Sequence, residues 1–244
     1  MCTALVWFDP KSDIPVCVAF NRDELYSRLE NTPQLYSGAA ARALYPVDTA
    51  SAGTWFGVNS NGIAGMLLND NRTSRAGKGS RGIWLANLLK NAVSLENAYS
   101  LALSGWQSRF RPSWAVLASF ERLVLLRLNS KVAKYELPPG LHILCDSSGF
   151  GLAKRGGWLR PKATSRPPPR CFDDVRELLS EHASCARRYY TTCCHAGISG
   201  TVSAQFLKLS RDKREARLWY VSGSPCSSTE PQEFILPLDL PASS

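Results

Sequence analysis

Residues 16–25 read Val16-Cys17-Val18-Ala19-Phe20-Asn21-Arg22-Asp23-Glu24-Leu25. Five apolar residues followed by four polar ones predict a buried strand with a polar end. A second apolar run, Thr3–Phe8, precedes it, and the Pro, Asp and Lys residues between the two runs predict a turn. We therefore expect two neighbouring strands, Thr3–Phe8 and Val16–Asn21, with the polar block beside the start of the first.

The rest of the chain groups its predicted strands and helices. Further strands are expected at Trp55–Asn59, Ile63–Asn69, Ser113–Phe120, Leu123–Asn129, Val132–Leu137, Leu141–Cys145, Thr201–Leu209, Arg217–Val221 and Phe234–Leu236. Helices are expected at Ser80–Ala92, Leu95–Ser104 and Asp173–His182, and an exposed loop at the proline-rich Arg160–Arg170. Strands, then helices, then strands predict layered packing with mostly antiparallel pairing, in one domain over residues 1–244.

The composition is that of a globular protein with a basic surface. Lys and Arg outnumber Asp and Glu by 29 to 20, a formal net charge of +9. This balance favours anionic partners such as a lipid headgroup, a coenzyme phosphate or a carboxylate. No nucleic-acid-binding motif accompanies the charge, so we expect a small anionic or amphipathic ligand and no nucleic acid.

Eight cysteines are spread along the chain without regular spacing. The apolar run Thr3–Phe8 is too short for a signal peptide and lacks a basic segment before it. No stretch is long and apolar enough to span a membrane. We therefore expect a cytoplasmic protein with no integral membrane segment and with mostly free, buried thiols.

Cys2 is the first candidate for chemistry. Removal of Met1 would leave Cys2 with both a thiol and a free α-amino group. That amine has an ordinary pKa of about 7.7–8.0, so it can act as a built-in general base near neutral pH. Cys2 could thus serve as a nucleophile; the alternative is an ordinary cysteine near the start of a chain.

The polar block at the end of the second predicted strand is the second candidate. Paired strands would bring Arg22 or Asp23 beside Cys2. A guanidinium at that place favours a thiolate, and a carboxylate would anchor an α-ammonium. The alternative is a solvated end of a strand.

Several motifs in the first third of the chain resemble the NRDE family, also known as the transport and Golgi organisation protein 2 family. The motifs that carry the resemblance are Met1-Cys2-Thr3, Ala19–Arg28, Gly53–Val58, Asn61-Gly62, Asn69 and Ser80-Arg81-Gly82. The resemblance implies an α+β fold, a four-layer αββα sandwich of two mostly antiparallel sheets like that of N-terminal-nucleophile (Ntn) hydrolases. Cys2 would lie at the start of its first strand.

The same resemblance implies roles for individual residues. Arg22 and Asp23 correspond to an Arg and an Asp that follow the nucleophile in hydrolase relatives, and Asn69 corresponds to an oxyanion donor. Family members tend to carry Asn where this chain has Asp146, and Arg where it has Val202. Both differences remove groups suited to an anionic transition state.

A basic, glycine-rich segment precedes the first predicted helix. Gly77, Gly79 and Gly82 lie among Arg72, Arg75, Lys78 and Arg81. Backbone N–H groups at a helix start, together with positive charge, predict a cradle for a haem propionate, a coenzyme A phosphate or a lipid headgroup. The alternative is a flexible basic loop.

The chain offers few metal ligands by sequence pattern. Adjacent Cys193 and Cys194 with His195 do not match the spacing of a zinc site, so no metal ion is expected. His142 and His195 are candidate axial ligands for haem iron, and His182 is expected to cap a helix end.

Two functions follow from these features. The NRDE family is linked to haem mobilisation and to acyl-coenzyme A or lipid homeostasis. The resemblance therefore implies a ligand-handling protein, with haem as the expected ligand in a pocket at Cys2. Its contacts would come from Asn21, Glu24, Trp55, Arg75, Lys78, Arg81 and Asp146. The alternative is a hydrolase in which Cys2 attacks an amide, ester or thioester.

Overall fold

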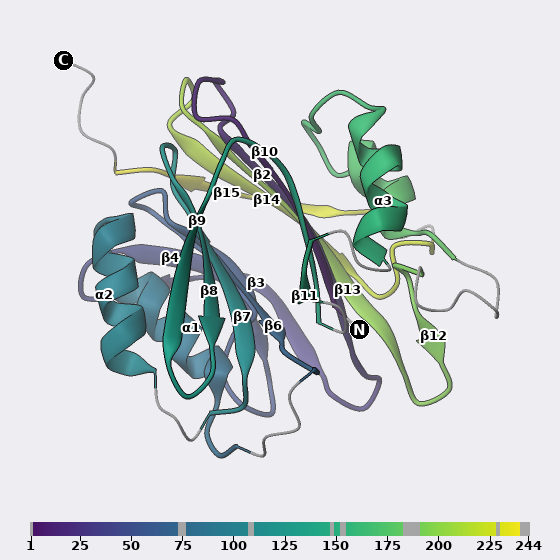
Figure 1. Ribbon diagram of the computed structural model, residues 1–244, viewed down its shortest axis with the longest axis horizontal. Coiled ribbons are helices and arrows are strands. Elements are labelled where there is room, and N and C mark those ends of the chain that lie inside the picture. Colours follow the sequence, from purple (N-terminus) through teal and green to yellow (C-terminus); the bar gives the residue numbers. More distant parts are fainter. Residues whose placement is uncertain are drawn as a thin grey trace.

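The computed structural model describes residues 2–72, 77–106, 110–146, 149–151, 155–182, 191–227 and 230–239. In these ranges the chain forms two antiparallel sheets that pack face to face, with helices on both outer faces (Figure 1). The predicted α+β fold, a four-layer αββα sandwich, is confirmed. Residues 3–8 and 16–25 form strands of one sheet, with Cys2 just before the first of them, and the described strands between residues 30 and 137 form the other sheet.

The strands of each sheet follow a simple order. The first sheet runs β11 (Gly149–Phe150), β10 (Gly140–Cys145), β1 (Thr3–Phe8), β2 (Val16–Leu25), β13 (Ser199–Ser210), β14 (Glu215–Ser222) and β15 (Gln232–Pro237), and β12 (His195–Ala196) pairs with β13. The second runs β3 (Glu30–Ser37), β4 (Arg42–Asp48), β5 (Phe56–Asn59), β6 (Ala64–Asn69), β7 (Ser113–Ala118), β8 (Leu123–Leu128) and β9 (Val132–Leu137).

Four described helices complete the layers. Helices α1 (Arg81–Asn91) and α2 (Leu95–Gly105) cover the second sheet, and α3 (Arg155–Thr164) and α4 (Asp173–Leu179) cover the first. Strand β2 shows how alternation builds three apolar layers. Val18 and Phe20 pack between the sheets, whereas Cys17 and Ala19 pack against α3 and α4.

Local signals in the sequence set several element ends. Gly62 takes a φ of 75° in the turn between β5 and β6, as the Asn-Gly pair predicts. The side chain of Ser80 accepts a hydrogen bond from the Ile83 N–H and caps α1, and Ser94 caps α2 in the same way. The predicted helices at these places are confirmed to within one residue at each end.

Strands β3 and β4 were not predicted from the sequence. Each contains a proline, Pro33 and Pro46, which removes a hydrogen-bond donor from the ladder. The register between the two strands shifts between Asn31 and Gln34, opposite Pro46. The bulge accommodates the prolines, so a pattern that argues against a strand is compatible with one here.

The predicted exposed loop at Arg160–Arg170 is partly wrong. Residues 160–164 belong to α3, and Pro161 lies inside that helix. Leu159 and Ala163 are buried against the first sheet, and this packing overrides the poor helix propensity of proline. The predicted helix Asp173–His182 is also shorter, because α4 ends at Leu179.

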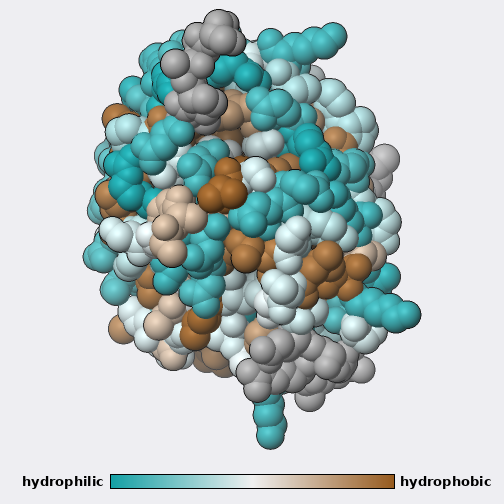
Figure 2. All heavy atoms as spheres, turned by 90° about the vertical axis from the view of Figure 1, so that its left-hand side faces the viewer, coloured by the Kyte–Doolittle hydropathy of each residue, from teal (hydrophilic) through white to brown (hydrophobic). Residues whose placement is uncertain are grey.

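Figure 2 looks onto the outer face that carries α1 and α2. Hydrophobic side chains on this face form separate groups among hydrophilic ones. A hollow of about 430 Å³ lies between the two helices, lined by residues that include Ile83, Trp84 and Leu101. Within the described ranges, every helix is too short or too polar to cross a membrane.

Candidate functional site

A cleft of about 510 Å³ opens where the two sheets meet the start of α1. It is lined from the first sheet by Cys2 and the end of β2, and from the second by β6 and the loop after β4. The lining residues are Cys2, Arg22, Asp23, Glu24, Arg28, Asp48, Ser51, Gly53, Thr54, Trp55, Leu67, Asn69, Gly77, Gly79, Ser80, Arg81, Gly82 and Arg111. Most of them are polar or charged.

Two glycines allow the loop after β4 to lie directly on α1. A Cβ atom on Gly53 would come within 2.5 Å of the backbone of Gly82, and one on Gly82 within 2.9 Å of the Thr54 nitrogen. The Thr54 N–H donates to the Gly82 carbonyl across this contact, at 3.1 Å. Part of the glycine pattern before the helix therefore serves packing, and this close approach forms one wall of the cleft.

Cys2 lies at the head of β1, half-buried, with its side chain toward the space between the sheets. The antiparallel register pairs Thr3 with Asn21, which brings the end of β2 alongside Cys2. The backbone N–H of Asp23 donates to the Cys2 Sγ at 3.4 Å, and the Asp23 carbonyl oxygen lies 3.6 Å from the same sulfur. The structure therefore brings together Cys2 and Asp23, as expected from the pairing of the two strands.

The thiol of Cys2 is not activated in this arrangement. Burial, together with the nearby carboxylates of Asp146 and Asp23, raises its pKa to about 12. A thiol in this environment stays protonated at neutral pH, so reactivity would require an additional positive charge close to the sulfur.

The carboxylate of Asp23 is held in place by Thr201. The Thr201 hydroxyl donates to Asp23 Oδ1 at 2.6 Å and accepts a hydrogen bond from the Cys194 N–H at 2.9 Å. No role for Thr201 was expected from the sequence. Its register opposite Asp23, on β13, depends on a pairing between segments almost 180 residues apart, which no local pattern reveals.

Asp146 lies behind Cys2 and is 3% exposed. Its backbone N–H donates to the Cys2 carbonyl oxygen at 3.2 Å, and its Oδ2 accepts from the Asn71 side chain at 3.2 Å. Its Oδ1 is buried and has no hydrogen-bond partner in the part of the chain that the structure describes. Burial, with the nearby charge of Asp23, raises the Asp146 pKa to about 6.

Arg22 also lines the cleft, but its charge is already matched. The guanidinium pairs with Glu30 at 2.5 Å and Asp48 at 2.6 Å, both on the second sheet, and lies 4.2 Å above the Trp55 ring. Arg28 shares the Asp48 carboxylate at 2.5 Å. The expected stabilisation of a Cys2 thiolate by Arg22 is therefore weak, because the two carboxylates hold the guanidinium.

The other residues expected at the site fall into two groups. Glu24, Trp55, Asn69 and Arg81 line the cleft, so their proposed contacts with a ligand or an oxyanion stay predictions that this geometry permits. Lys78 is exposed and does not line the cleft. Arg75 lies outside the described residues.

Three arginines give the cleft a positive region. Burial, together with the charges of Arg111 and Arg28, lowers the pKa of Arg81 to about 10. The guanidinium groups of Arg111 and Arg28 are near enough to Arg81 to repel its charge. An anionic group of a ligand would relieve their repulsion.

Asn21 was expected to contact the ligand, but it does not line the cleft. Its side chain is fully buried, and its Nδ2 donates to the carbonyl oxygens of Leu179 at 2.8 Å and Thr192 at 3.0 Å. These contacts lie on the helix-covered face of the sheet, because side chains alternate along β2. Asn21 therefore braces the fold and does not line the cleft.

Neither histidine expected as a haem ligand lies in the cleft. His142 is on β10, where its Nε2 lies 2.7 Å from the Pro138 oxygen and its ring stacks on Phe150. His195 is on β12, beside Cys193 and Cys226. Cys2 is the only group lining the cleft, among the described residues, with a donor typical of haem iron ligands.

Comparison with solved structures identifies the fold. The chain is similar to a Caenorhabditis elegans ortholog of N-acylethanolamine-hydrolyzing acid amidase, with a TM-score of 0.55 and 12% identity over 84% of this chain and 92% of that chain. It is also similar to the mutant C2A of the conjugated bile acid hydrolase from Clostridium perfringens, with a TM-score of 0.54 and 11% identity over 98% of this chain and 93% of that chain. These are Ntn-hydrolase-fold proteins, and at such low identity the likeness shows the fold alone.

Sequence comparison identifies the family. No curated protein is significantly similar to the chain. The family model for Transport and Golgi organisation 2 matches residues 1–159, which include Cys2, the polar end of β2, the contact between Gly53 and Gly82, and Asp146. The resemblance drawn from the sequence motifs is thereby confirmed, and the chain belongs to the Transport and Golgi organisation 2 family.

Proposed function

We propose that this chain is an N-terminal-nucleophile hydrolase in which Cys2, freed by removal of Met1, cleaves an amide, ester or thioester. One observation carries the proposal. The Cys2 thiol lines a cleft large enough for a small ligand and contacts Asp23 at the point where β1 begins. A nucleophile at the head of the first strand can reach a substrate in the cleft and use its own amine as base.

The similar structures support the reaction class by analogy of fold. One of these proteins is an amidase that hydrolyses N-acylethanolamines, and another is a hydrolase of conjugated bile acids. The second was solved as a mutant in which a cysteine at its own position 2 is replaced by alanine. A shared fold does not fix a shared activity, so the site residues must carry the argument.

The buried carboxylates near Cys2 suit a free amino group. An α-ammonium on Cys2 would lie near Asp23 and Asp146, and Asp146 Oδ1 has no other partner among the described residues. Its positive charge would oppose the two carboxylates that now raise the thiol pKa. The charge of the amino terminus already lowers the thiol pKa in part, and removal of Met1 would place that charge, and with it the base, on Cys2 itself.

The proposed reaction has two steps. The Cys2 thiol attacks the carbonyl carbon, its proton passes to the α-amine, a C–S bond forms, and the leaving amine, alcohol or thiol departs with that proton. Water then attacks the thioester, which releases a carboxylic acid and restores the thiol. Asn69, which lines the same cleft, is the proposed donor to the oxyanion.

The charge of the cleft points to an anionic substrate. Arg28 and Arg22 are engaged with the carboxylates of Glu24 and Asp48, and Asp23 is bonded to Thr201, whereas Arg81 and Arg111 also line the cleft. An acyl compound that carries a carboxylate or phosphate would use the remaining positive charge.

A substrate panel tests the proposal. The full chain without an N-terminal extension is assayed on neutral and anionic acyl amides, esters and thioesters. We expect turnover that Cys2→Ala abolishes and that Cys171→Ser, which removes a half-buried thiol on another face, leaves intact. Activity that persists in Cys2→Ala would contradict the proposal.

A second candidate function is the binding of haem, an acyl-coenzyme A or a lipid without chemistry. The cluster of Arg28, Arg81 and Arg111 favours it, because propionates and phosphates are anionic. Haemin titration tests whether the cleft binds haem specifically. A sharp Soret band that is lost in both Cys2→Ala and Arg81→Ala would support this function, and a broad band like that of an unrelated basic protein would contradict it.

A further inference from the structure

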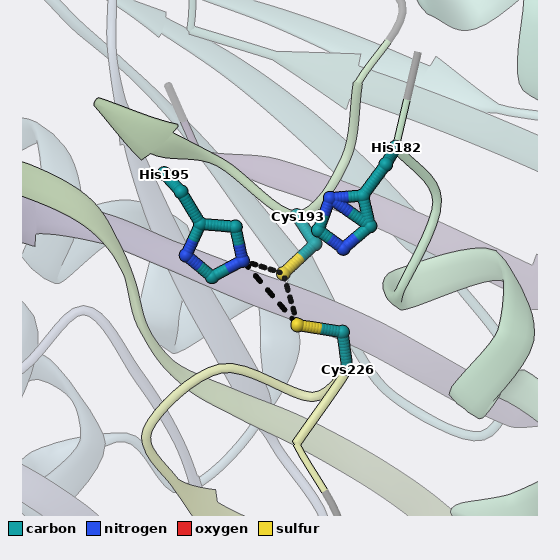
Figure 3. Close-up of side chains that lie close together, drawn as sticks. All are labelled: His182, Cys193, His195 and Cys226. Atoms are coloured by element: carbon teal, nitrogen blue, oxygen red, sulfur yellow. Dashed lines mark hydrogen bonds between the residues drawn. The ribbon is translucent and has the colours of Figure 1, made fainter.

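Four side chains outside the cleft converge at one point on the first sheet. His182 follows α4, Cys193 and His195 lie at β12, and Cys226 lies in the turn after β14 (Figure 3). Their nearest ligand atoms all lie within 4.8 Å of one another. We propose that His182, Cys193, His195 and Cys226 form a structural zinc site.

The distances among the ligand atoms of Cys193, His195 and Cys226 match the edges of a zinc tetrahedron. Zinc–sulfur bonds of about 2.3 Å and zinc–nitrogen bonds of about 2.0 Å give edges of roughly 3.3–3.8 Å. Cys193 Sγ lies 3.5 Å from Cys226 Sγ and 3.6 Å from His195 Nε2, and His195 Nε2 lies 3.3 Å from Cys226 Sγ. The ring of His182 stacks on that of His195 with centroids 5.1 Å apart, and its ligand nitrogen lies within 4.8 Å of the other three ligand atoms, so a small shift would bring it to the fourth corner.

Backbone hydrogen bonds bring the three segments together without the metal. The N–H groups of Thr192 and Cys193 both donate to the Glu181 carbonyl oxygen, which sets His182 beside Cys193. The Gly223 N–H donates to the Val202 oxygen, and the Ser224 hydroxyl to the Thr201 oxygen, which brings the turn that holds Cys226 against β13.

The spacing of the ligands explains why the sequence did not reveal the site. Residues two apart in extended backbone point to the same side, so Cys193 and His195 act together and Cys194 points away. The Cys194 thiol lies 4.0 Å from the Thr191 carbonyl oxygen instead, and its backbone N–H donates to the Thr201 hydroxyl. The other two ligands come from turns more than ten residues before and thirty after, a pattern unlike the usual paired motifs of zinc sites. His182, expected to cap a helix, is placed past the end of α4.

The donor set selects the metal and its role. Two thiolates and two imidazoles in a tetrahedral arrangement suit zinc. Binding releases the thiol protons of Cys193 and Cys226 to solvent, and the complex of one Zn²⁺ with two thiolates has no net charge. Four protein ligands leave no open position for a substrate, so the role is structural.

The site would stabilise the segment that supports Asp23. Cys193 lies between Thr192, whose carbonyl accepts from Asn21, and Cys194, whose N–H donates to the Thr201 hydroxyl. That hydroxyl holds the Asp23 carboxylate. The zinc proposal does not depend on hydrolysis, because it concerns metal content and stability only.

Metal analysis of the full chain tests the inference. Protein produced with zinc and kept reduced should hold about one zinc ion per chain, the content of a single four-ligand site. Replacement by Co²⁺ should give the intense visible bands of tetrahedral cobalt and a thiolate charge-transfer band. Cys226→Ser and His195→Gln, both at exposed positions, should lower zinc affinity at least tenfold, whereas Cys171→Ser should not.

Three results would overturn the inference. One is reduced wild-type protein, folded by circular dichroism, that holds no zinc and gives no cobalt bands. Another is zinc that remains equally bound in Cys226→Ser and Cys171→Ser. The third is a Cys193–Cys226 disulfide in freshly purified protein, since a disulfide would consume both thiolates. The wild-type measurements decide the question even if a variant fails to fold.

Discussion

At the scale of single residues, Asp146 is the charged group that most raises the pKa of the Cys2 thiol. It is buried, its backbone is hydrogen-bonded to the Cys2 carbonyl, and its charge raises the thiol pKa. An asparagine at this position would present no charge to the sulfur. Because the pKa of Asp146 is about 6, the charge beside Cys2 changes with pH near neutrality.

Asp146→Asn should make stability less dependent on pH. The folded-state pKa of about 6 lies above the ordinary value of an aspartate, so Asp146 contributes stability below pH 4 that is lost as pH rises through 6. We expect the variant to be more stable than the wild type at pH 7 by about 2 kcal/mol, and similar to it at pH 4. Urea unfolding at the two pH values measures this. An equal difference in the free energy of unfolding between variant and wild type at both pH values would contradict a buried Asp146 carboxyl with a raised pKa.

The same substitution should make the thiol more reactive. Removal of a negative charge near the sulfur lowers the Cys2 pKa, so alkylation of Cys2 should begin at lower pH than in the wild type. The rate of iodoacetamide modification is followed at Cys2 by peptide mass spectrometry, with the half-buried Cys171 as the internal reference. An unchanged pH profile would mean that Asp146 does not act on the thiol.

Thr201→Val should weaken the site through Asp23. The variant removes the hydroxyl that donates to Asp23 Oδ1 while keeping the shape of the side chain. A lost hydrogen bond to a charged group costs about 1.5–3 kcal/mol, which corresponds to a loss of roughly tenfold or more in kcat/KM. Thr164→Val, which removes an exposed hydroxyl bonded within α3, is the control. Equal activity in both variants would show that Asp23 does not need this anchor.

At the scale of elements, the contact between the loop after β4 and the start of α1 forms the cleft wall. Strands β1 and β2 and helices α1 and α2 could be predicted because alternation, capping and turn residues are local signals. Strands β3 and β4 could not, since their prolines are tolerated only through a bulge between two strands. Helix α3 was missed for the same kind of reason, because its stability comes from packing on the sheet.

Gly53→Ala should disrupt this wall. The added Cβ would lie 2.5 Å from the Gly82 backbone, so the loop and the helix start must separate. We expect a loss of about 2 kcal/mol or more in the free energy of unfolding, typical of overpacking against backbone. Gly105→Ala is the control, because its Cβ would only approach the Trp84 ring, at 3.2 Å. Equal stability of the two variants would contradict the close contact.

At the scale of the whole molecule, a network centred on Arg22 connects the two sheets. Arg22 lies on β2, whereas its partners Glu30 and Asp48 lie on β3 and β4. Tyr220 on β14 adds a second link, because its hydroxyl donates to Glu30. The sequence indicated that Arg22 would be near Cys2, but its partners come from the two strands that local patterns did not reveal.

Arg22→Met should destabilise the protein strongly. It leaves the carboxylates of Glu30 and Asp48 buried without their main partner, which costs about 3–5 kcal/mol. Tyr220→Phe removes one hydrogen bond to the same network and should cost about 1 kcal/mol. Chemical unfolding of both variants measures the difference, and a small effect of Arg22→Met would mean that the network does not hold the sheets together.

Much of the fold, but less of the site, could be predicted from the sequence. The contact between Cys2 and Asp23 could be predicted because neighbouring strands place these residues side by side. Thr201, Arg111 and the four side chains of the zinc site come from segments far apart along the chain. Asn21 was misplaced because alternation along β2 turns it toward the helices.

The central claim is that Cys2, with a free amine, forms an acyl intermediate. The direct measurement is the intact mass of the untagged chain, acid-quenched during turnover of an activated acyl ester. We predict a mass that lacks Met1 and carries one acyl group, located on Cys2 and absent from Cys2→Ala. A chain that turns over substrate while it retains Met1, or an acyl group that persists in Cys2→Ala, would contradict the account.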